Sequence, residues 1–408
     1  MNYSIFHPTG IINGEINLPR SKSLSNRALI IHALNNKKFE IEHLSLSNDT
    51  IVLQRALNSK EKLINIEDAG TAMRFLTSYF SIQKSETILT GSDQMKKRPI
   101  GELVDSLRHL GADIEYLEKE NYPPIKIIGK ELNGGEININ SEVSSQFISS
   151  LLMIAPLLKN GIKINLQNDI VSKPYILMTL KMLNYFGIEY LFKDNSINIS
   201  NQPYQLKNIK IENDWSAVAF WLEMVSLSKK ARIILKGLNK NSWQGDSFSP
   251  NFFKDLGVLS YFEDSNFILE KKQNSEPAKK NIHLIDYPDL SLALINTYAF
   301  KKITANFTGL STLKRKESDR LTSLQTELKK CGINAKIDSD SFSINAVNIT
   351  NITPSFSTYK DHRIAMCLAP LALQKTVVVE DVEVVKKSYP NYWEDLKKVG
   401  FTITPLTH

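Results

Sequence analysis

The sequence predicts an α/β protein of two domains, each built from three copies of one folding unit. Two observations lead to this fold class. The chain has 408 residues, which is more than one ordinary hydrophobic core accommodates. In addition, one local pattern recurs along the chain: an amphipathic helix, then Gly, then a short alternating strand. Recurrence of helix, turn and strand together indicates a repeated α/β unit.

The repeated pattern is marked by glycines at the ends of predicted helices. They are Gly111, Gly187, Gly257, Gly332 and Gly400, spaced 68 to 76 residues apart. Gly is favoured where a helix ends in a left-handed residue, so each marks a turn from helix to strand. A period of about 70 residues is too long for a solenoid and suits two helices with several strands. A helix predicted at 50–57 fits as a first copy without its Gly.

Composition narrows the possible functions. The chain is 42% hydrophobic and 23% charged, as in ordinary globular proteins. Its net charge of +7 comes without a basic tail or a basic run interleaved with aromatic residues. This argues against nucleic-acid binding and suits small anionic substrates. Cys331 and Cys367 lack metal-ligand spacing, so we expect two core thiols and no metal site.

The N-terminal residues and the apolar segments indicate where in the cell the protein is expected. Residues 1–8 contain no apolar core of a signal peptide, and no apolar stretch approaches membrane-spanning length. We therefore expect a cytoplasmic protein.

Candidate functional residues gather where predicted helices begin. Residues 20–27 precede a helix predicted at 28–34, and the charged segment 315–320 precedes one predicted at 321–328. Exposed backbone N–H groups make helix starts favourable for anions. For any one segment, simple helix capping explains the residues equally well. The arrangement recurs at seven helix starts, however, and this favours a ligand site.

If the repeats point these helix starts the same way, they converge on one cleft. Its cations would be Lys22, Arg27, Arg98, Lys316, Arg320, Arg363 and Lys387. That is more positive charge than one phosphate needs, so we expect two anionic ligands. Asp289, Glu317 and His362 are the candidates for proton transfer.

These motifs, in this order, closely resemble the 5-enolpyruvylshikimate-3-phosphate (EPSP) synthase family, the 3-phosphoshikimate 1-carboxyvinyltransferases. Each piece is weak alone, but the combination is specific and spans essentially the whole chain. The matching segments are residues 18–28, 69–74, 98–101, 144–147, 172–175, 316–320 and 361–366.

The resemblance implies a fold, the inside-out α/β barrel, with two domains of three βαβαββ units each and pseudo-threefold symmetry. It places an N-terminal lobe at 21–212, mainly on the shikimate 3-phosphate side. The C-terminal lobe, 1–20 and 213–408, would supply the acid/base groups and the clamp for phosphoenolpyruvate. The two lobes would close over a central cleft.

The resemblance also implies an activity. The enolpyruvyl group of phosphoenolpyruvate would move to the 5-hydroxyl of shikimate 3-phosphate, releasing phosphate through a tetrahedral intermediate. This step lies on the shikimate pathway to chorismate and the aromatic amino acids, and it is the target of glyphosate. No cofactor or metal is implied. We expect a monomer whose partners are these two anions, with no nucleic acid or membrane.

Roles carry over residue by residue. Asp289 resembles the base and Glu317 the acid, with Lys22 touching both substrates and His362 beside them. Shikimate 3-phosphate would contact Lys22, Ser23, Arg27, Ser144, Ser145, Gln146, Ser172, Tyr175, Asp289, Thr312 and Lys316. Phosphoenolpyruvate would contact Lys22, Asp68, Gly70, Arg98, Gln146, Arg320, Arg363 and Lys387. Arg320 and Arg363 would hold its carboxylate.

Three positions depart from the family pattern. Asp68 and Thr312 stand where Asn is common, and Phe75 stands where Pro is usual. A carboxylate at position 68 would repel phosphoenolpyruvate unless a cation such as Arg98 or Arg74 lies beside it.

Three alternatives remain to be weighed. UDP-N-acetylglucosamine enolpyruvyl transferase, the rival within this fold, carries a Cys in the loop before its Arg-Pro and an Asn after its first Lys. Here residues 91–98 contain no Cys and Ser23 follows Lys22, which disfavours that rival. A binding protein without catalysis would have lost the acid/base pair, which is present. A nucleic-acid module rests on net charge alone.

Overall fold

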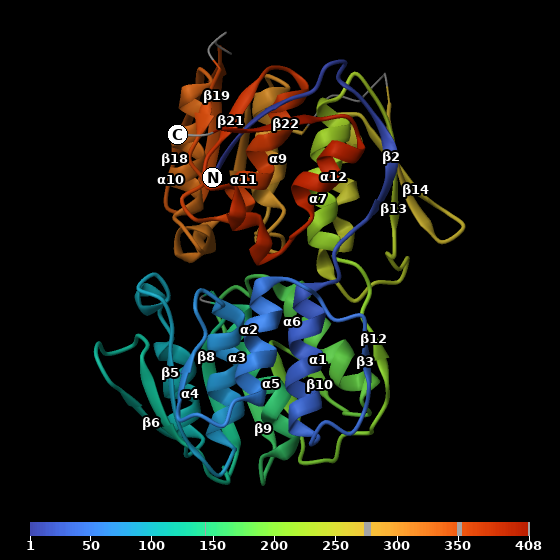
Figure 1. The fold of residues 1–408 in the computed structure, drawn as a ribbon. Helices are drawn as coiled ribbons and strands as arrows, with labels where there is room; N and C mark the ends of the chain where they lie inside the picture. The colour runs from blue at the N-terminus through green and yellow to red at the C-terminus, as the bar shows by residue number, and fades with distance from the viewer. Residues whose placement is uncertain (143, 273–278, 349–352, 407–408) are drawn as a thin grey trace. The chain divides into compact units, whose positions relative to one another are not determined.

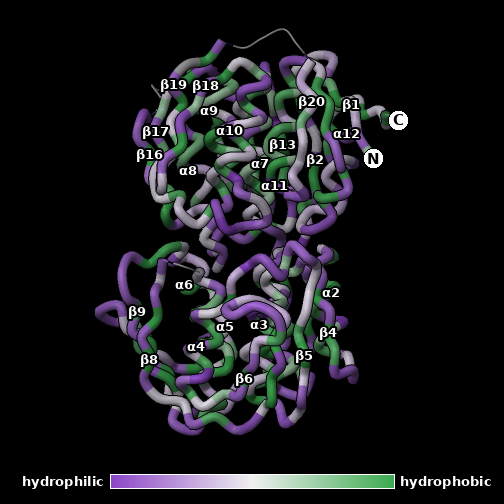
Figure 2. The backbone as a smooth tube through the Cα atoms, turned by 90° about the vertical axis from the view of Figure 1, so that its left-hand side faces the viewer, coloured by the Kyte–Doolittle hydropathy of each residue, from purple (hydrophilic) through white to green (hydrophobic). Residues whose placement is uncertain are grey.

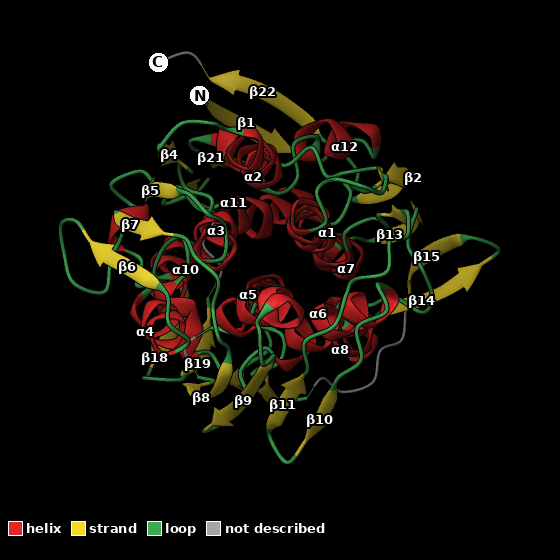
Figure 3. Ribbon diagram, turned by 90° about the horizontal axis from the view of Figure 1, so that it is seen from below, coloured by secondary structure: helices red, strands yellow, loops and turns green. Residues whose placement is uncertain are grey.

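The computed structural model describes residues 1–142, 144–272, 279–348 and 353–406. It divides the chain into two compact units, described separately below. The N-terminal unit is Arg20–Ile211, and the C-terminal unit combines Met1–Pro19 with Glu212–His408. In each unit the helices lie inside and the strands lie around them (Figure 3).

The N-terminal unit contains helices and strands that alternate along the chain (Figure 1). Its helices are α1 (Lys22–Leu34), α2 (Asn48–Asn58), α3 (Gly70–Ser81), α4 (Gly101–His109), α5 (Ser145–Ile154) and α6 (Lys173–Tyr185). Its strands are β3 (Ile41–Glu42), β4 (Leu63–Asn65), β5 (Glu86–Thr90), β6 (Asp113–Tyr116), β7 (Ile125–Ile128), β8 (Gly135–Asn140), β9 (Ile162–Gln167), β10 (Leu191–Lys193), β11 (Ser196–Ile199) and β12 (Ile209–Lys210).

The C-terminal unit repeats this plan. Its helices are α7 (Trp215–Leu227), α8 (Pro250–Phe253), α9 (Ser291–Phe300), α10 (Arg320–Lys330), α11 (His362–Leu368) and α12 (Tyr392–Lys398). Its strands are β1 (Asn2–Phe6), β2 (Ile11–Asn17), β13 (Lys230–Lys236), β14 (Val258–Glu263), β15 (Asn266–Lys271), β16 (Asn281–His283), β17 (Ala305–Thr308), β18 (Ile333–Ile337), β19 (Ser341–Val347), β20 (Ser355–Phe356), β21 (Val377–Val379) and β22 (Thr402–Leu406).

The four-stranded sheets share one topology. In the order β4-β5-β7-β6, the first two strands are parallel, and an antiparallel hairpin continues the sheet. The orders β8-β9-β11-β10, β2-β13-β15-β14 and β16-β17-β19-β18 follow the same rule. The order β20-β21-β1-β22 has the same strand directions, but its antiparallel pair joins the first and last strands of the chain instead of a hairpin. Each of the five predicted turn glycines has a positive φ and precedes an outermost strand of such a sheet. The predicted helix-to-strand turns are therefore confirmed.

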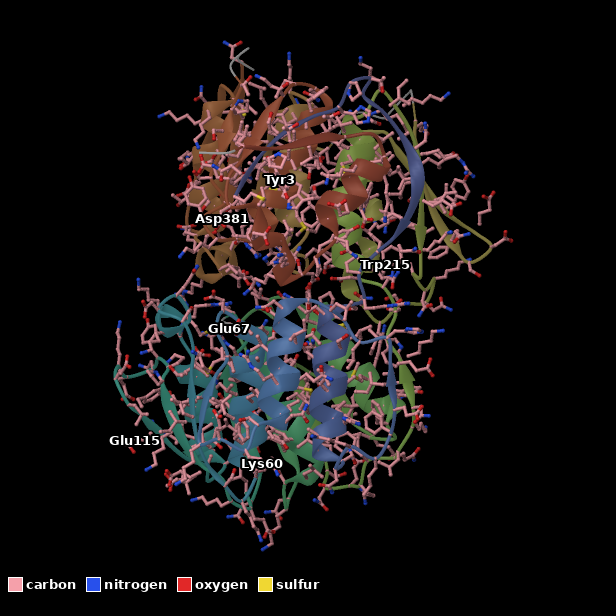
Figure 4. The ribbon with its side chains drawn as sticks, in the orientation of Figure 1. Tyr3, Lys60, Glu67, Glu115, Trp215 and Asp381 are labelled. Atoms are coloured by element: carbon pink, nitrogen blue, oxygen red, sulfur yellow. The ribbon has the colours of Figure 1, made fainter. Side chains whose placement is uncertain are left out.

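The first copy of the repeat is abbreviated. Its sheet contains only the parallel strands β3 and β12, joined in the register Ile41 to Ile209. The short connection from α2 to β4 includes Lys60, labelled in Figure 4. This copy lacks the turn Gly and also the hairpin that follows it elsewhere. A cavity of about 370 Å³ borders α1, β3 and α2 at this place.

The helices lie inside because several are apolar on every face. All residues of α9 are buried, as is nearly all of α7, the pattern expected of a helix surrounded by core. Trp215, the first residue of α7 (Figure 4), packs against Phe267 with ring centroids 5.0 Å apart. Hydrophobic and hydrophilic stretches alternate along the rest of the backbone (Figure 2). No helix in the described ranges is long and apolar enough to cross a membrane.

Two predicted helix starts were wrong. Helix α1 begins at Lys22, not at residue 28, because the Ser21 hydroxyl accepts from the Leu24 N–H and caps it. The polar residues that suggested a loop face neighbouring elements; Thr50 Oγ1, for example, donates to Asn26 Oδ1 at 2.8 Å. The helix predicted at 50–57 likewise begins earlier, at Asn48.

Candidate active site

The first turns of the helices in the N-terminal unit are neighbours. Lys22 of α1 reaches Asp49 of α2, with Nζ to Oδ2 at 3.1 Å. Gln146 of α5 donates to Thr71 Oγ1 of α3 at 3.2 Å. Arg74 of α3 donates to the Pro99 carbonyl, just before α4, at 3.1 Å. Several helix N-termini, with their outward N–H groups, thus meet at one end of this unit.

Lys22 is held by a nearly buried carboxylate. The side chains of Lys22 and Asp49 are 16% and 3% exposed. Burial strengthens such a charge pair, so Asp49 fixes the direction of the ammonium group. Sequence reasoning missed Asp49, which lies 27 residues from Lys22 in a helix whose first turn carries no other charge.

Arg27 is buried among neutral hydrogen-bond acceptors. Its guanidinium donates to Thr179 Oγ1 at 2.7 Å, to Ser149 Oγ at 3.1 Å and to the Ser23 and Tyr175 carbonyls. Burial lowers the pKa of Arg27 to about 10, and the Tyr175 phenol partly opposes this shift. These bonds join α1 to α5 and α6. The structure therefore gives Arg27 a framework role within its unit, beside the predicted contact with a carboxylate.

Gly70 provides space for an arginine. A Cβ at position 70 would lie 2.4 Å from Arg98 Nη1 and 3.0 Å from Arg74 Nη1. The two guanidinium groups can approach the first turn of α3 this closely only because Gly has no side chain. Arg74 also donates to the Gly70 carbonyl at 3.0 Å. Asp68, two residues earlier, accepts a hydrogen bond from Ser92 Oγ.

The predicted hydroxyl donors occupy the starts of α5 and α6. The Ser144 hydroxyl caps α5 by accepting from the Gln146 N–H at 3.3 Å, and Ser145 is the first helical residue. Ser172 precedes α6 with a left-handed backbone, φ 58°, a conformation that is uncommon outside Gly. Tyr175 lies in the first turn of α6.

The C-terminal unit brings together its own predicted residues around Asp289. Its carboxylate lies 3.1 Å from Arg363 Nη2, 3.3 Å from Arg320 Nη1 and 3.9 Å from Lys316 Nζ. Burial alone would raise the pKa of Asp289, but Arg363, Lys316 and Arg320 hold it well below its usual value. Asp289 is therefore ionised and able to accept a proton.

Arg320 is the centre of this cluster and is 1% exposed. It donates to Glu317 Oε2 at 2.7 Å from Nη2 and to Asp361 Oδ2 at 2.8 Å from Nε. Although burial disfavours its charge, the carboxylates of Asp361, Glu317 and Asp289 raise the pKa of Arg320 above its ordinary value. One guanidinium thus contacts two of the three predicted proton-transfer groups, Asp289 and Glu317.

The remaining predicted residues of this unit lie on nearby elements. His362 begins α11 and is 1% exposed, with Nδ1 3.7 Å from Asp361 Oδ1. Thr312 lies in a 3-10 helix, Ser311–Arg315, and Lys387 ends another, Val382–Lys387. Asp361 begins the matching segment 361–366, but the sequence did not predict it as a functional residue. It caps α11 and is fully buried.

Within the part of the chain that the structure describes, no group of three or more His, Cys, Asp or Glu side chains could hold a metal ion.

The sequence of this chain is similar to that of one known protein family over most of its length. The model of the family "EPSP synthase (3-phosphoshikimate 1-carboxyvinyltransferase)" matches residues 51–396. The chain belongs to the EPSP synthase family. A 3-phosphoshikimate 1-carboxyvinyltransferase of Bacteroides fragilis (strain YCH46) is 43% identical over 407 residues, covering 99% of each chain. That of Colwellia psychrerythraea is 35% identical, covering 98% of this chain and 100% of its own. The predicted family is confirmed.

Solved structures of the EPSP synthase family show the same fold. EPSP synthase from Acinetobacter baumannii superposes with a TM-score of 0.76 at 20% identity, covering 99% of this chain and 100% of that one. This likeness confirms the predicted α/β fold class.

Proposed function

We propose that this chain transfers the enolpyruvyl group of phosphoenolpyruvate to the 5-hydroxyl of shikimate 3-phosphate and releases phosphate. Membership of the EPSP synthase family supports this reaction, as do relatives named for it. The observation that carries the proposal is the placement of Asp289 and Glu317 on one buried guanidinium, at 3.3 and 2.7 Å. Addition of a hydroxyl group across the double bond of an enol phosphate needs one group to give a proton and another to take one, side by side.

The proposed chemistry is an addition followed by an elimination. Glu317 gives a proton to the methylene carbon of phosphoenolpyruvate, the 5-hydroxyl oxygen bonds to its C2, and Asp289 accepts the hydroxyl proton. The product is a tetrahedral ketal. In the second step the Glu317 carboxylate takes a proton from the new methyl group while the C2–O bond to phosphate breaks, and Asp289 gives its proton to the leaving phosphate. This restores the carbon–carbon double bond.

The ion pairs of the cluster explain how substrate would prepare these groups. Asp289 is already ionised, as a base must be, because three cations lower its pKa. Glu317 must instead be protonated to act as an acid, and its contact with Arg320 opposes this. A substrate carboxylate on Arg320 and Arg363 would replace Glu317 and Asp289 as the partner of these cations. The pKa of Asp289 would then rise, and Glu317 would lose the contact that opposes its protonation, which favours proton transfer.

The N-terminal unit is proposed to hold shikimate 3-phosphate. Ser144, Ser145, Ser172 and Gln146 supply neutral donors at two helix starts, and Lys22 supplies charge. The same unit contributes Arg98, above Gly70, to the phosphate of phosphoenolpyruvate. Lys316 and Lys387 would complete the phosphate contacts from the C-terminal unit.

The proposal also covers the oligomeric state, the ligands and the location of the protein. We propose a monomer in the cytoplasm, with these two anions as its only ligands and without nucleic acid or membrane. Sedimentation of the purified protein would test the monomer, since a concentration-dependent dimer contradicts it.

The activity is tested by mixing the protein with shikimate 3-phosphate and phosphoenolpyruvate and measuring released phosphate. UDP-N-acetylglucosamine serves as the control acceptor. We expect release only with shikimate 3-phosphate. Release with the nucleotide sugar, or with neither acceptor, would refute the proposal.

A further inference from the structure

Helix α10 carries a buried carboxylate, that of Glu327, toward the opposite end of the helix from the cluster around Arg320. Glu327 is fully buried, two turns beyond Arg320 on the same helix. Its Oε1 accepts from the Tyr359 hydroxyl at 2.6 Å, and its Oε2 accepts from the Ser357 N–H at 3.2 Å and from Lys330 at 2.7 Å. A buried carboxylate with several donors is a strong anchor.

Two of these donors, Ser357 and Tyr359, belong to one strained segment, residues 357–361, which we call the 357–361 turn. Tyr359 and Lys360 both have left-handed backbones, with φ of 54° and 56°. Two successive residues of this kind persist only where surrounding contacts hold them. Burial, together with the hydrogen bond to Glu327, raises the pKa of Tyr359 to about 12, so its hydroxyl stays a donor.

The turn ends at the cluster. Its last residue, Asp361, caps α11 by accepting from the Arg363 N–H at 2.9 Å and also accepts from Arg320 Nε at 2.8 Å. The 357–361 turn is therefore fixed at its start by Glu327 and at its end by Arg320, two residues of one rigid helix. Arg363 lies two residues after Asp361, and its guanidinium contacts the Asp289 carboxylate.

We propose that Glu327 is a positioning residue for the carboxylate clamp of Arg320 and Arg363, acting through Tyr359 and the 357–361 turn. This inference rests on the proposed function, in which those two arginines bind the carboxylate of phosphoenolpyruvate. Glu327 touches neither substrate. It sets the place of α11 relative to α10, and so the separation of the two guanidinium groups.

Tyr359→Phe is the sharpest variant, because it removes one hydroxyl and keeps the ring. We expect the KM for phosphoenolpyruvate to rise about three- to tenfold, as for the loss of one good hydrogen bond, with shikimate 3-phosphate affinity unchanged. Glu327→Gln should act in the same direction and more strongly, since its amide places N–H groups toward a donor. Lys330→Met is the matched control. It removes the partner on the exposed side of the same carboxylate, so both ligands should bind as in the parent.

Kinetics, calorimetry with shikimate 3-phosphate and thermal unfolding are measured on all three variants. A lower melting temperature with an unchanged KM for phosphoenolpyruvate would mean that Glu327 only stabilises the fold, and would overturn the inference. Equal weakening of both ligands would overturn it as well.

Hydrogen–deuterium exchange gives a readout independent of activity, and so separates this inference from the proposed function. Amides of residues 357–363 should exchange faster in Tyr359→Phe than in Lys330→Met. Equal exchange in the two variants would refute the role of Glu327 even in a fully active enzyme. An inactive parent protein would refute the proposed function instead.

Discussion

The buried arginines of the two units have different hydrogen-bond partners. In the N-terminal unit, Arg27 and Arg74 donate to hydroxyls and backbone carbonyls. In the C-terminal unit, Arg320 and Arg363 pair with carboxylates. Neutral acceptors such as those around Arg27 satisfy an arginine without cancelling its charge, which can then attract an anion. Carboxylate partners cancel that charge until a substrate displaces them. The first arrangement suits standing binding of a phosphate, and the second suits proton transfer controlled by substrate.

The largest effect is expected from removing the base of the C-terminal cluster. Asp289→Asn should lower turnover by about 10²–10⁴, as loss of a general base usually does, while shikimate 3-phosphate still binds. Steady-state kinetics measure this loss. Asp319→Asn is the control, because Asp319 only caps α10 through Thr322. Near-normal turnover of Asp289→Asn would remove Asp289 from the mechanism.

Replacing one Asp by Asn in each unit should show how much an ion pair of that unit contributes to the free energy of unfolding. Asp361→Asn breaks a buried pair with Arg320, whose partners are 0% and 1% exposed, and should lower the free energy of unfolding by about 3–5 kcal/mol. Asp49→Asn, beside the partly exposed Lys22, should cost about 1–2 kcal/mol. Urea unfolding at pH 7 measures both. Equal losses would mean that the two units do not differ in this respect.

The pH dependence of stability should also distinguish the cluster. The pKa of Asp289 in the folded state is below its ordinary value, so its charge stabilises the folded state above about pH 4 and that contribution is lost as pH falls. The unfolding free energies of the parent and Asp289→Asn should therefore begin to approach one another as the pH falls to about 4, and should continue to do so at lower pH until the folded-state pKa of Asp289 is passed. A gap that stays constant on acidification would contradict the ion pairs around Asp289.

A smaller effect is expected at the arginine above α3. In Gly70→Ala the new Cβ would lie 2.4 Å from Arg98 Nη1, so the flexible guanidinium must shift. We expect the KM for phosphoenolpyruvate to rise about two- to tenfold, on the scale of one hydrogen bond. Glyphosate, the bulkier anion, should lose more. Inhibition kinetics against phosphoenolpyruvate compare the two, and an alanine variant more sensitive to glyphosate than its parent would be the contrary result.

Local signals in the sequence predicted what depends on local geometry. Each turn Gly, such as Gly187 or Gly332, has the positive φ that a helix-to-strand turn requires. The missing Gly after α2 also corresponded to a real difference, because that copy lacks its hairpin. Residues 22–27 were wrongly predicted to be a loop, since the polar side chains of Ser25, Asn26 and Arg27 are buried rather than exposed.

Long-range partners had no such signal. Asp49 neutralises Lys22 from another helix, and Asp361 holds Arg320 from 41 residues away. Nothing in the neighbourhood of either carboxylate indicates its partner, because that pairing is created only when the helices pack. The cations of the candidate site could be predicted from the sequence, whereas the groups that orient them could not.

Titration calorimetry with shikimate 3-phosphate alone tests most directly the claim that the two units divide the work. Ser172→Ala changes the N-terminal unit, and Arg363→Ala changes the cluster of the C-terminal unit. Loss of a hydrogen bond to a charged group costs about 1.5–3 kcal/mol, so Ser172→Ala should weaken binding about tenfold to a hundredfold. Arg363→Ala should leave the affinity for this ligand unchanged. Equal weakening in both variants would contradict the division.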